Sequence, residues 1–287
     1  MAGVEGRVIA VTGAGNGLGR DYAKLLAHNG ALVVVNDLGG SRDGTGSGSA
    51  AADAVVAEIK EAGGEAVANY DSVATSEGGA AIVQTALDAF GKIDGVIANA
   101  GILRDKSFHK MEDAEFDIVL QVHLYGAYNV IHAAWPHLRD QGYGRIVVAT
   151  STSGVYGNFG QANYGAAKLG MVGMINTLAI EGAKYNIKAN AVAPIAATRM
   201  TADIMDEATL GKLDPAFVAP VVGTLVTEEL EESGRIYVAG GGVVQAVRYF
   251  STPGARFEQV PSLAEVGAKW AEINDWSNPI VGRMPGI

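Results

Sequence analysis

Tyr164 and Lys168 are the residues of this chain whose types and spacing most directly suggest chemistry. They stand four residues apart in the segment "YGNFGQANYGAAK", so on a helix both side chains would lie on one face. A free tyrosine, with a pKa of about 10, is a poor base at neutral pH, but a nearby ammonium group favours its phenolate form. The pair therefore suits general-base removal of a hydroxyl proton, although an ordinary surface pair is the alternative.

Ser151 closes the apolar run that precedes this segment, thirteen residues before Tyr164. A corner between the two would bring the serine hydroxyl beside the phenol, where it could hold a substrate oxygen whose charge changes. Tyr156 lies within that corner and is expected to pack there or to line a substrate site. We therefore predict one catalytic set of Ser151, Tyr164 and Lys168.

A glycine-rich segment, "TGAGNGLGR", follows the first apolar run and opens the first helical pattern. Its spacing is T-G-x-x-x-G-x-G rather than a strict G-x-G-x-x-G. Glycines let the backbone turn tightly and approach a pyrophosphate, to which the N-terminus of a helix offers N–H donors. The residues predicted to contact a dinucleotide here are Gly13, Gly15, Asn16, Gly17, Leu18 and Gly19.

Asp37 ends the next apolar run. A carboxylate about 20 residues beyond a glycine loop can accept hydrogen bonds from the adenosine ribose and would repel a 2′-phosphate, so it favours NAD over NADP. A strand-end turn residue is the alternative, and Arg42 nearby weakens the preference. The next two runs end at the same predicted sheet edge, and their last residues complete the predicted cofactor site: Asp71, Ser72 and Val73 for the adenine, then Asn99, Ala100 and Gly101.

Seven short runs rich in β-branched residues indicate the strands of this protein. Most are continuously apolar, which is typical of strands buried on both faces. The strands are expected at 7–13, 31–37, 65–71, 93–101, 144–151, 187–194 and 234–241. Segments with helical spacing separate them, at 18–29, 50–62, 77–90, 114–138 and 162–184. The alternation predicts an α/β fold, a single Rossmann-type doubly wound parallel sheet with helices on both faces.

This domain is expected to span residues 1–241. The tail, residues 242–287, contains Trp270 and Trp276 and is expected to pack on the body or at a subunit interface. The segment "GGSRDGTGSGSAAAD", which starts at Gly39, has the composition of a mobile surface loop. Because it follows the second strand directly, folding over a bound cofactor is the alternative.

Composition excludes several classes of function. The net charge of −10 shows no basic surplus for nucleic-acid binding, and the absence of cysteine excludes disulfides and thiolate chemistry. His28, His109, His132 and His137 show no metal-ligand spacing, so no metal site is expected. The sequence shows neither a signal peptide, nor an apolar run of about 20 residues, nor a C-terminal peroxisomal signal. A soluble, cytoplasmic bacterial protein without membrane partners is expected.

The glycine loop, Asp37, "NAG", Ser151 and the Tyr-x-x-x-Lys pair, in this order, resemble the short-chain dehydrogenase/reductase family. The resemblance implies a nicotinamide cofactor, which Tyr164 and Lys168 also contact, with Lys168 at its ribose. It also implies a homodimer or homotetramer built on the two longest helices. It also implies that "PIAAT" contacts the nicotinamide end. The residues so implied are Pro194, Ile195, Ala196 and Thr198. His123 stands where the family often has an asparagine that holds a proton-relay water, and a neutral imidazole could do the same.

A narrower resemblance rests on "VVVNDLGG", "NAGILRDKSF" and "YGNFGQANYGAAKLG". They are similar to the (3R)-hydroxyacyl-CoA dehydrogenase module of peroxisomal multifunctional enzyme type 2, also known as 17β-hydroxysteroid dehydrogenase type 4, a group that also carries this histidine. It implies NAD-dependent oxidation of a (3R)-3-hydroxyacyl-CoA, with a fatty acyl chain or a sterol side chain, to the 3-oxoacyl-CoA, with Tyr164 as general base.

Three alternatives stay open: a 17β-hydroxysteroid dehydrogenase, an NADPH-linked 3-oxoacyl-ACP reductase and a non-catalytic NAD-binding protein. Asp37 argues against the reductase, and the intact catalytic set argues against the non-catalytic protein. The expected substrate lid, from Met200 to about Val222, would separate acyl-CoA from steroid. A basic stretch after "NAG" could meet CoA phosphates or form a solvated loop; it contains Arg104, Lys106, His109 and Lys110.

Overall fold

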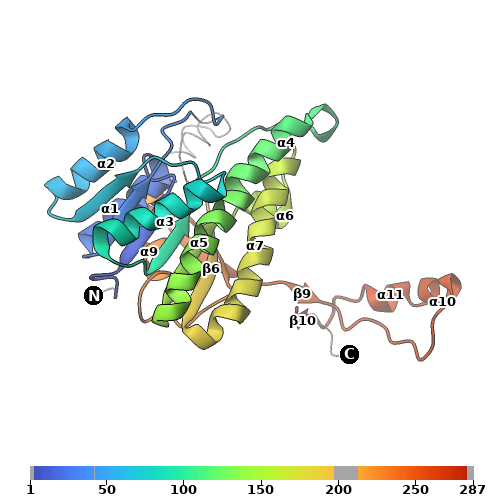
Figure 1. Ribbon diagram of the computed structural model, residues 1–287. Helices are drawn as coiled ribbons and strands as arrows, with labels where there is room; N and C mark the ends of the chain where they lie inside the picture. Colours follow the sequence, from blue (N-terminus) through green and yellow to red (C-terminus); the bar gives the residue numbers. More distant parts are fainter. Residues whose placement is uncertain (1–2, 42, 197–212, 283–287) are drawn as a thin grey trace. The chain divides into compact units, whose positions relative to one another are not determined.

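Strands and helices alternate along most of the chain (Figure 1). The computed structural model describes residues 3–41, 43–196 and 213–282, and two compact units divide the chain, residues 1–245 and 246–287. The strands of the first unit are β1 Val8–Thr12, β2 Leu32–Asn36, β3 Glu65–Asn69, β4 Gly95–Ala98, β5 Gly144–Ala149, β6 Ile187–Pro194 and β7 Ile236–Gly240, and β8 Val243–Val247 crosses the boundary. Its α-helices are α1 Gly17–His28, α2 Ala50–Glu61, α3 Ser76–Phe90, α4 Asp113–Leu120, α5 Gly126–Gln141, α6 Thr152–Tyr156, α7 Ala162–Gly182 and α9 Ala219–Thr224.

The strands form one sheet in the order β3-β2-β1-β4-β5-β6-β7-β8. The ladders from β3 to β7 are parallel, and every residue of β1 and β5 is buried. The direction of the winding reverses between β1 and β4, and in such sheets ligands bind outside the carboxyl ends of the strands at this switch point. The predicted Rossmann-type fold is confirmed.

Helices cover both faces of the sheet. On one face α1 packs against α2 and α9, while on the other α3 packs against α5 and α7 lies against β6 (Figure 1). The buried core between α1, α2 and the sheet consists largely of valine, isoleucine, leucine and alanine. Small and branched side chains of this kind let helices lie close to a parallel sheet, so the strand ends are held rigidly.

The segment predicted helical at 114–138 is helical throughout, with one π turn within it that the apolar spacing does not reveal. The chain passes from α4 through one π-helical turn, Gln121–Tyr125, into α5. A Cβ on Gly126 would stand 2.8 Å from Cγ2 of Val73, so the start of α5 packs tightly on the segment after β3. Single π turns inside helices often mark functional positions, and this one carries His123.

Unit 246–287 differs in kind from the first unit. Its elements are β9 Phe250–Ser251, α10 Leu263–Ala268, α11 Trp270–Ile273 and β10 Ile280–Val281, and β9 pairs antiparallel with β10. No described residue between 246 and 282 is buried, and Val260 and Leu263 are 98% and 92% exposed. The unit therefore has no hydrophobic core of its own.

Candidate active site

The glycine loop connects the end of β1 to the start of α1 at the switch point of the sheet. A Cβ on Gly13 would lie 2.8 Å from Cα of Ala100, and one on Gly19 would lie 2.2 Å from the carbonyl oxygen of Gly13. Thr12 Oγ1 accepts hydrogen bonds from the backbone N–H groups of Asn99 and Ala100, each at 3.1 Å. The ends of β1 and β4 are thus joined, with no room for a side chain at Gly13 or Gly19.

Asp37 joins two loops through its two carboxylate oxygens. Oδ2 accepts a hydrogen bond from the backbone N–H of Gly15 at 2.8 Å, and Oδ1 accepts one from Gly39 at 2.7 Å. A Cβ on Gly15 would stand 2.8 Å from this carboxylate. The carboxylate is therefore held in one position beside the glycine loop, which is where recognition of an adenosine ribose requires it.

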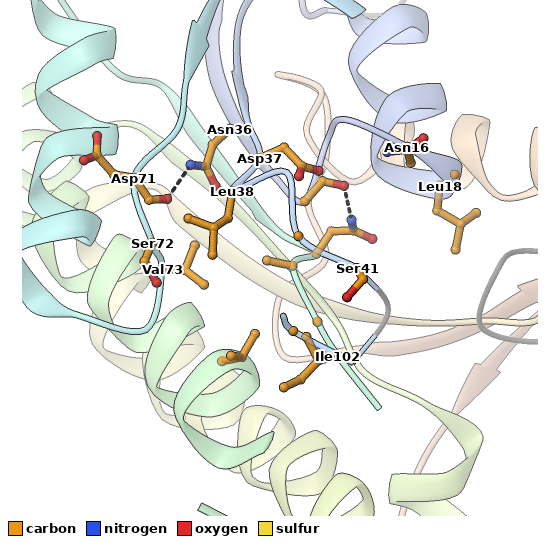
Figure 2. A pocket seen from close by; sticks show the side chains of 18 residues that line it. Asn16, Leu18, Asn36, Asp37, Leu38, Ser41, Asp71, Ser72, Val73 and Ile102 are labelled. Atoms are coloured by element: carbon orange, nitrogen blue, oxygen red, sulfur yellow. Dashed lines mark hydrogen bonds between the residues drawn. The ribbon is translucent and has the colours of Figure 1, made fainter. Parts of the chain in front are cut away.

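A cavity of about 220 Å³ lies at this edge of the sheet. Figure 2 shows Asp37, Leu38, Ser41 and Ile102 around it. The predicted cofactor residues that line it are Gly13, Asn16, Gly17, Leu18, Asp37, Asp71, Ser72, Val73, Asn99, Ala100 and Gly101. A narrow cleft walled by glycine backbone at a helix N-terminus fits the phosphates of a dinucleotide, so the residues present suit such a cofactor.

Seven further residues line the cavity that sequence reasoning missed: Asn36, Leu38, Gly40, Ser41, Gly44, Ile102 and Val122. Ile102 and Leu38 directly follow predicted positions, so extending each strand end by one residue would have found them. Gly40, Ser41 and Gly44 belong to the loop that sequence reasoning favoured as a mobile surface loop. The alternative, a loop that folds over the cofactor site, is the arrangement in the structure.

Gly15 and Gly19 of the predicted set do not line this cavity, and neither do Pro194, Ile195 and Ala196. Gly15 and Gly19 instead provide the close backbone packing around it. Pro194 ends β6, and Ile195 donates its N–H to the carbonyl of Ala239 at 2.8 Å. Thr198 and the predicted lid up to residue 212 lie outside the described residues.

The predicted catalytic residues meet at the carboxyl end of β5. Ser151 caps the N-terminus of α6, and its hydroxyl forms a hydrogen bond with Tyr164, on the first turn of α7. Lys168 lies one turn further along α7, with Nζ 5.3 Å from the ring centroid of Tyr164. Its ammonium group donates to the carbonyl of Ala149 at the end of β5. The expected strand-to-helix corner therefore does bring all three side chains together.

Burial dominates the electrostatics of this cluster. It raises the pKa of Tyr164 to about 12, although the hydrogen bond with Ser151 acts in the opposite direction. It also lowers the pKa of Lys168 to about 7. Both groups therefore resist charging, and positive charge beside the ring would favour the phenolate form of Tyr164.

His123 is buried behind the tyrosine. Its ring meets that of Tyr164 edge to face, with centroids 5.2 Å apart and an interplanar angle of 86°. Nε2 lies 3.0 Å from the backbone nitrogen of Ile102 and 2.8 Å from its carbonyl oxygen, while Nδ1 has no hydrogen-bond partner among the described residues. Burial and then the charge of Lys168 lower the pKa of His123 well below its usual value. A neutral imidazole that supports Tyr164 agrees with these contacts better than a proton carrier.

A second pair of loops, one through Asp105 and Lys106 and the other through Gly160 and Gln161, borders the cluster. Lys106 donates its N–H to the carbonyl of Gly160 at 2.9 Å, and the side-chain amide of Gln161 donates to Asp105 at 2.8 Å. Lys106 also forms an ion pair with Glu115 at 2.6 Å. Three aromatic side chains project from these loops with large exposed fractions: Phe108 77%, Tyr156 70% and Phe159 87%. Tyr156 therefore does not pack in the corner.

A family model described as short chain dehydrogenase matches residues 7–209. This protein is a member of the short-chain dehydrogenase/reductase family. It is an oxidoreductase of the NAD(P)-dependent kind, as relatives named dehydrogenases and reductases also indicate. The family predicted from the sequence is confirmed.

Relatives extend this result over nearly the whole chain. The putative short-chain type dehydrogenase/reductase Rv0148 of Mycobacterium tuberculosis is 66% identical over 96% of this chain and 97% of its own length. Peroxisomal multifunctional enzyme type 2 of Mus musculus is 53% identical, again over 96% of this chain but only 37% of its own length. The predicted similarity to that enzyme is also confirmed, for about a third of its length.

Two solved structures have the same fold. A short chain dehydrogenase from Mycobacterium avium superposes with a TM-score of 0.82 at 37% identity, covering 94% of this chain and 95% of that one. Full-length peroxisomal multifunctional enzyme type 2 from Drosophila melanogaster gives a TM-score of 0.81, also at 37% identity, over 98% of this chain and 47% of that one. Other short-chain dehydrogenases thus share this protein's fold.

The described part of this short-chain dehydrogenase contains neither a membrane-spanning helix nor a metal-binding cluster. Within residues 3–41, 43–196 and 213–282, none of the helices has the length and apolar character needed to cross a membrane. In the same ranges no cluster of three or more histidine, aspartate or glutamate side chains is arranged to hold a metal ion. The roles of the individual site residues stay predictions.

Proposed function

We propose that this short-chain dehydrogenase oxidises a (3R)-3-hydroxyacyl-CoA to the 3-oxoacyl-CoA with NAD, in the cytoplasm of a bacterium. The observation that carries the proposal is the meeting of Ser151, Tyr164 and Lys168 beside a glycine-walled cleft that fits a dinucleotide. The substrate is inferred from relatives whose names include hydroxyacyl-CoA dehydrogenase and hydratase-dehydrogenase-epimerase. NAD, when bound, accepts the hydride that leaves the hydroxyl-bearing carbon of the substrate.

The chain itself would hold the cofactor along the switch point. The backbone of Gly13–Leu18 would lie against the pyrophosphate, Asp37 would accept hydrogen bonds from the adenosine ribose, and Asp71–Val73 would border the adenine. Asn99–Gly101, Pro194–Ala196 and Thr198 are proposed for the nicotinamide end. The fixed carboxylate of Asp37 supports NAD over NADP, because a 2′-phosphate beside it would be repelled.

Tyr164 is the proposed general base. The Ser151 hydroxyl would position the substrate oxygen, and the phenolate oxygen of Tyr164 would take the hydroxyl proton. Because burial raises the pKa of Tyr164 to about 12, the phenolate forms only where positive charge is added nearby. The ammonium form of Lys168, whose pKa burial lowers to about 7, and the positive charge of an oxidised nicotinamide would together supply that charge, and His123 would hold the ring in place.

An anionic substrate with a long apolar part fits the loops around the cluster. Phe108, Tyr156 and Phe159 offer exposed aromatic surface, and His109 and Lys110 are exposed basic groups beside Phe108. Acyl-CoA thioesters combine an apolar chain with phosphates, whereas a free steroid has no use for the basic groups. A 37% identical relative, the 3-oxoacyl-[acyl-carrier-protein] reductase of Synechocystis, keeps the reductive alternative open, against which Asp37 argues.

The test is NADH formation by the purified protein with (3R)-3-hydroxyacyl-CoA, (3S)-3-hydroxyacyl-CoA and a 17β-hydroxysteroid. We expect strong preference for the (3R) thioester. Turnover of the steroid alone would contradict the substrate while leaving the catalytic set intact. Retained turnover in Tyr164→Phe would contradict the mechanism. Binding of NAD without turnover of any hydroxy compound would instead favour a non-catalytic role.

We also propose a homodimer or homotetramer. Tyr125, Tyr128, Leu169 and Ile180 are large apolar side chains exposed on the π turn, α5 and α7, and two long helices with such faces suit pairing with a second copy. Residues 242–287, of which the described positions 246–282 include no buried residue, are proposed to pack on the body or on a partner subunit. Light scattering of the full chain would give the number of subunits.

A further inference from the structure

The loop of residues 38–48, between β2 and α2, is a closed structure. The backbone N–H of Gly48 donates to the carbonyl of Leu38 at 2.9 Å, so the two ends of the loop meet. A Cβ on Gly39, whose φ is +75°, would stand 1.9 Å from the carbonyl oxygen of Gly48. Compact loops whose ends touch, packed by their own side chains, are frequently functional. We refer to this segment, described at every position except 42, as the 38–48 loop.

One carboxylate oxygen organises the interior of the 38–48 loop. Oδ1 of Asp43 accepts hydrogen bonds from Ser41 Oγ at 2.5 Å, from Thr45 Oγ1 at 2.7 Å and from the backbone N–H of Thr45 at 3.0 Å. These bonds lower the pKa of Asp43 below its usual range. The backbone adds a bond from the N–H of Ser41 to the carbonyl of Thr45 at 2.8 Å. Asp43 therefore links Ser41 to Thr45 across the turn.

The 38–48 loop contacts the proposed cofactor site at two points, its start and its tip. At its start, Gly39 donates to Oδ1 of Asp37 at 2.7 Å. At its tip, a Cβ on Gly44 would meet Cδ1 of Ile102 at 3.1 Å, so the tip lies directly against the residue that follows "NAG". Between these points the loop lines the cavity with Leu38, Gly40, Ser41 and Gly44 (Figure 2).

Beside the bonds to Asp43, the middle of this loop is ordered by polar contacts of Ser41 with Thr45 and Gly44, such as the one between Ser41 Oγ and the carbonyl of Thr45 at 3.0 Å. Gly46 and Gly48 have open space where a Cβ would lie, and five of the loop's residues are glycine. Glycine-rich chain without side-chain bonds behaves as a flexible coil. The wall of the cavity on this side therefore depends on three small polar side chains rather than on hydrophobic packing.

We propose that the 38–48 loop is a preformed wall that retains the dinucleotide, and that Asp43 is a positioning residue for it. The inference rests on the proposed function, because it takes the cavity to bind NAD and NADH. Asp43 acts through the loop and does not contact the reacting atoms. Its loss opens one side of the cleft, so the dinucleotide dissociates faster while the Ser151–Tyr164–Lys168 cluster is unaffected.

The experiment measures the dissociation rate of NADH from the full chain by stopped-flow fluorescence. Asp43→Ala removes the accepting oxygen, and we expect it to raise the dissociation rate about tenfold. A tenfold change is less than the combined free energy of three hydrogen bonds. Asp43→Asn keeps a carbonyl oxygen in that position and is expected to stay within about threefold of wild type. Asp88→Ala, which removes an exposed carboxylate on α3, is the matched control and leaves the rate unchanged.

A second variant, Thr45→Val, removes one hydroxyl donor and is expected to give a smaller increase than Asp43→Ala. Unchanged NADH dissociation in both Asp43→Ala and Thr45→Val would overturn the inference while leaving the proposed function in place. Equal increases in Asp43→Ala and Asp43→Asn would also overturn it, because the carboxylate charge would then be the cause. Failure of the wild type to bind NADH would instead overturn the proposed function first.

Discussion

The proposed cofactor half and the proposed catalytic half of the site are built in opposite ways. Around the glycine loop the backbone itself forms the wall, and Gly13 and Gly19 stand where a single methyl group would collide with the backbone of another residue. Around β5 and α7 the functional atoms belong to buried side chains, and burial shifts the pKa values of Tyr164 and Lys168. Substitutions that add atoms should therefore impair the cofactor half. Substitutions that remove functional atoms should impair the catalytic half.

The largest expected effect tests the side-chain half. Tyr164→Phe removes the phenol oxygen and keeps the ring against His123. We expect turnover to fall by about 10³-fold, in the range that general-base groups contribute, with NAD affinity within about twofold of wild type because Tyr164 does not line the cavity. Turnover kinetics and NADH fluorescence titration measure the two quantities. Equal losses in turnover and in cofactor affinity would contradict the division of the site into a catalytic half and a cofactor half.

The next effect tests the backbone half. In Gly19→Ala the new methyl group would lie 2.2 Å from the carbonyl oxygen of Gly13, which the loop can relieve only by moving. We expect NAD affinity to fall about 100-fold and stability by about 1–3 kcal/mol. Gly173→Ala on α7, where the methyl group meets open space, is the control and should stabilise the helix by about 0.5–1 kcal/mol. Calorimetric titration with NAD and chemical unfolding separate the two variants.

A third prediction concerns the contact between the halves. A Cβ on Gly101 would lie 2.2 Å from Cε1 of His123, so Gly101→Ala should destabilise the protein by about 2 kcal/mol. In a His123→Ala background the methyl group has space, and the same change should cost about 1 kcal/mol less. Chemical unfolding of the four proteins gives the coupling. If the two changes in the free energy of unfolding were simply additive, the His123 ring would not occupy the space next to Gly101.

The last prediction is a pH dependence. The folded pKa of Lys168, lowered to about 7, lies below its unfolded value, so between these pKa values the unfolded chain binds more protons and stability rises with pH. Lys168→Met lacks this titration. Its free energy of unfolding relative to wild type should therefore fall as the pH rises from 7 toward 9, by up to about 1.4 kcal/mol per pH unit. Lys184→Met, at an exposed position, is the control and should show a constant difference.

Much of the fold could be predicted because it depends on local pattern. Strands such as β1 and β5 are continuous apolar runs, and each predicted strand of the sheet is present within a few residues of its expected ends. The segment predicted helical at 114–138 is helical throughout, but residues 121–125 form a π turn, which the apolar spacing does not reveal. The short elements of unit 246–287 carry no periodic signal and were not predicted.

The sequence by itself determined which residues could do chemistry and where the glycine loop had to be, because residue type and spacing along one element decide these. Only the tertiary structure decided that His123 is buried against Tyr164, that burial opposes ionisation of Tyr164 and Lys168, and that Asp43 bonds Ser41 and Thr45 in a loop that lines the cavity. Each of these depends on which distant segments meet and how much water they exclude. Desolvation and contact are properties of the folded assembly of elements and are not encoded in the spacing of any one of them.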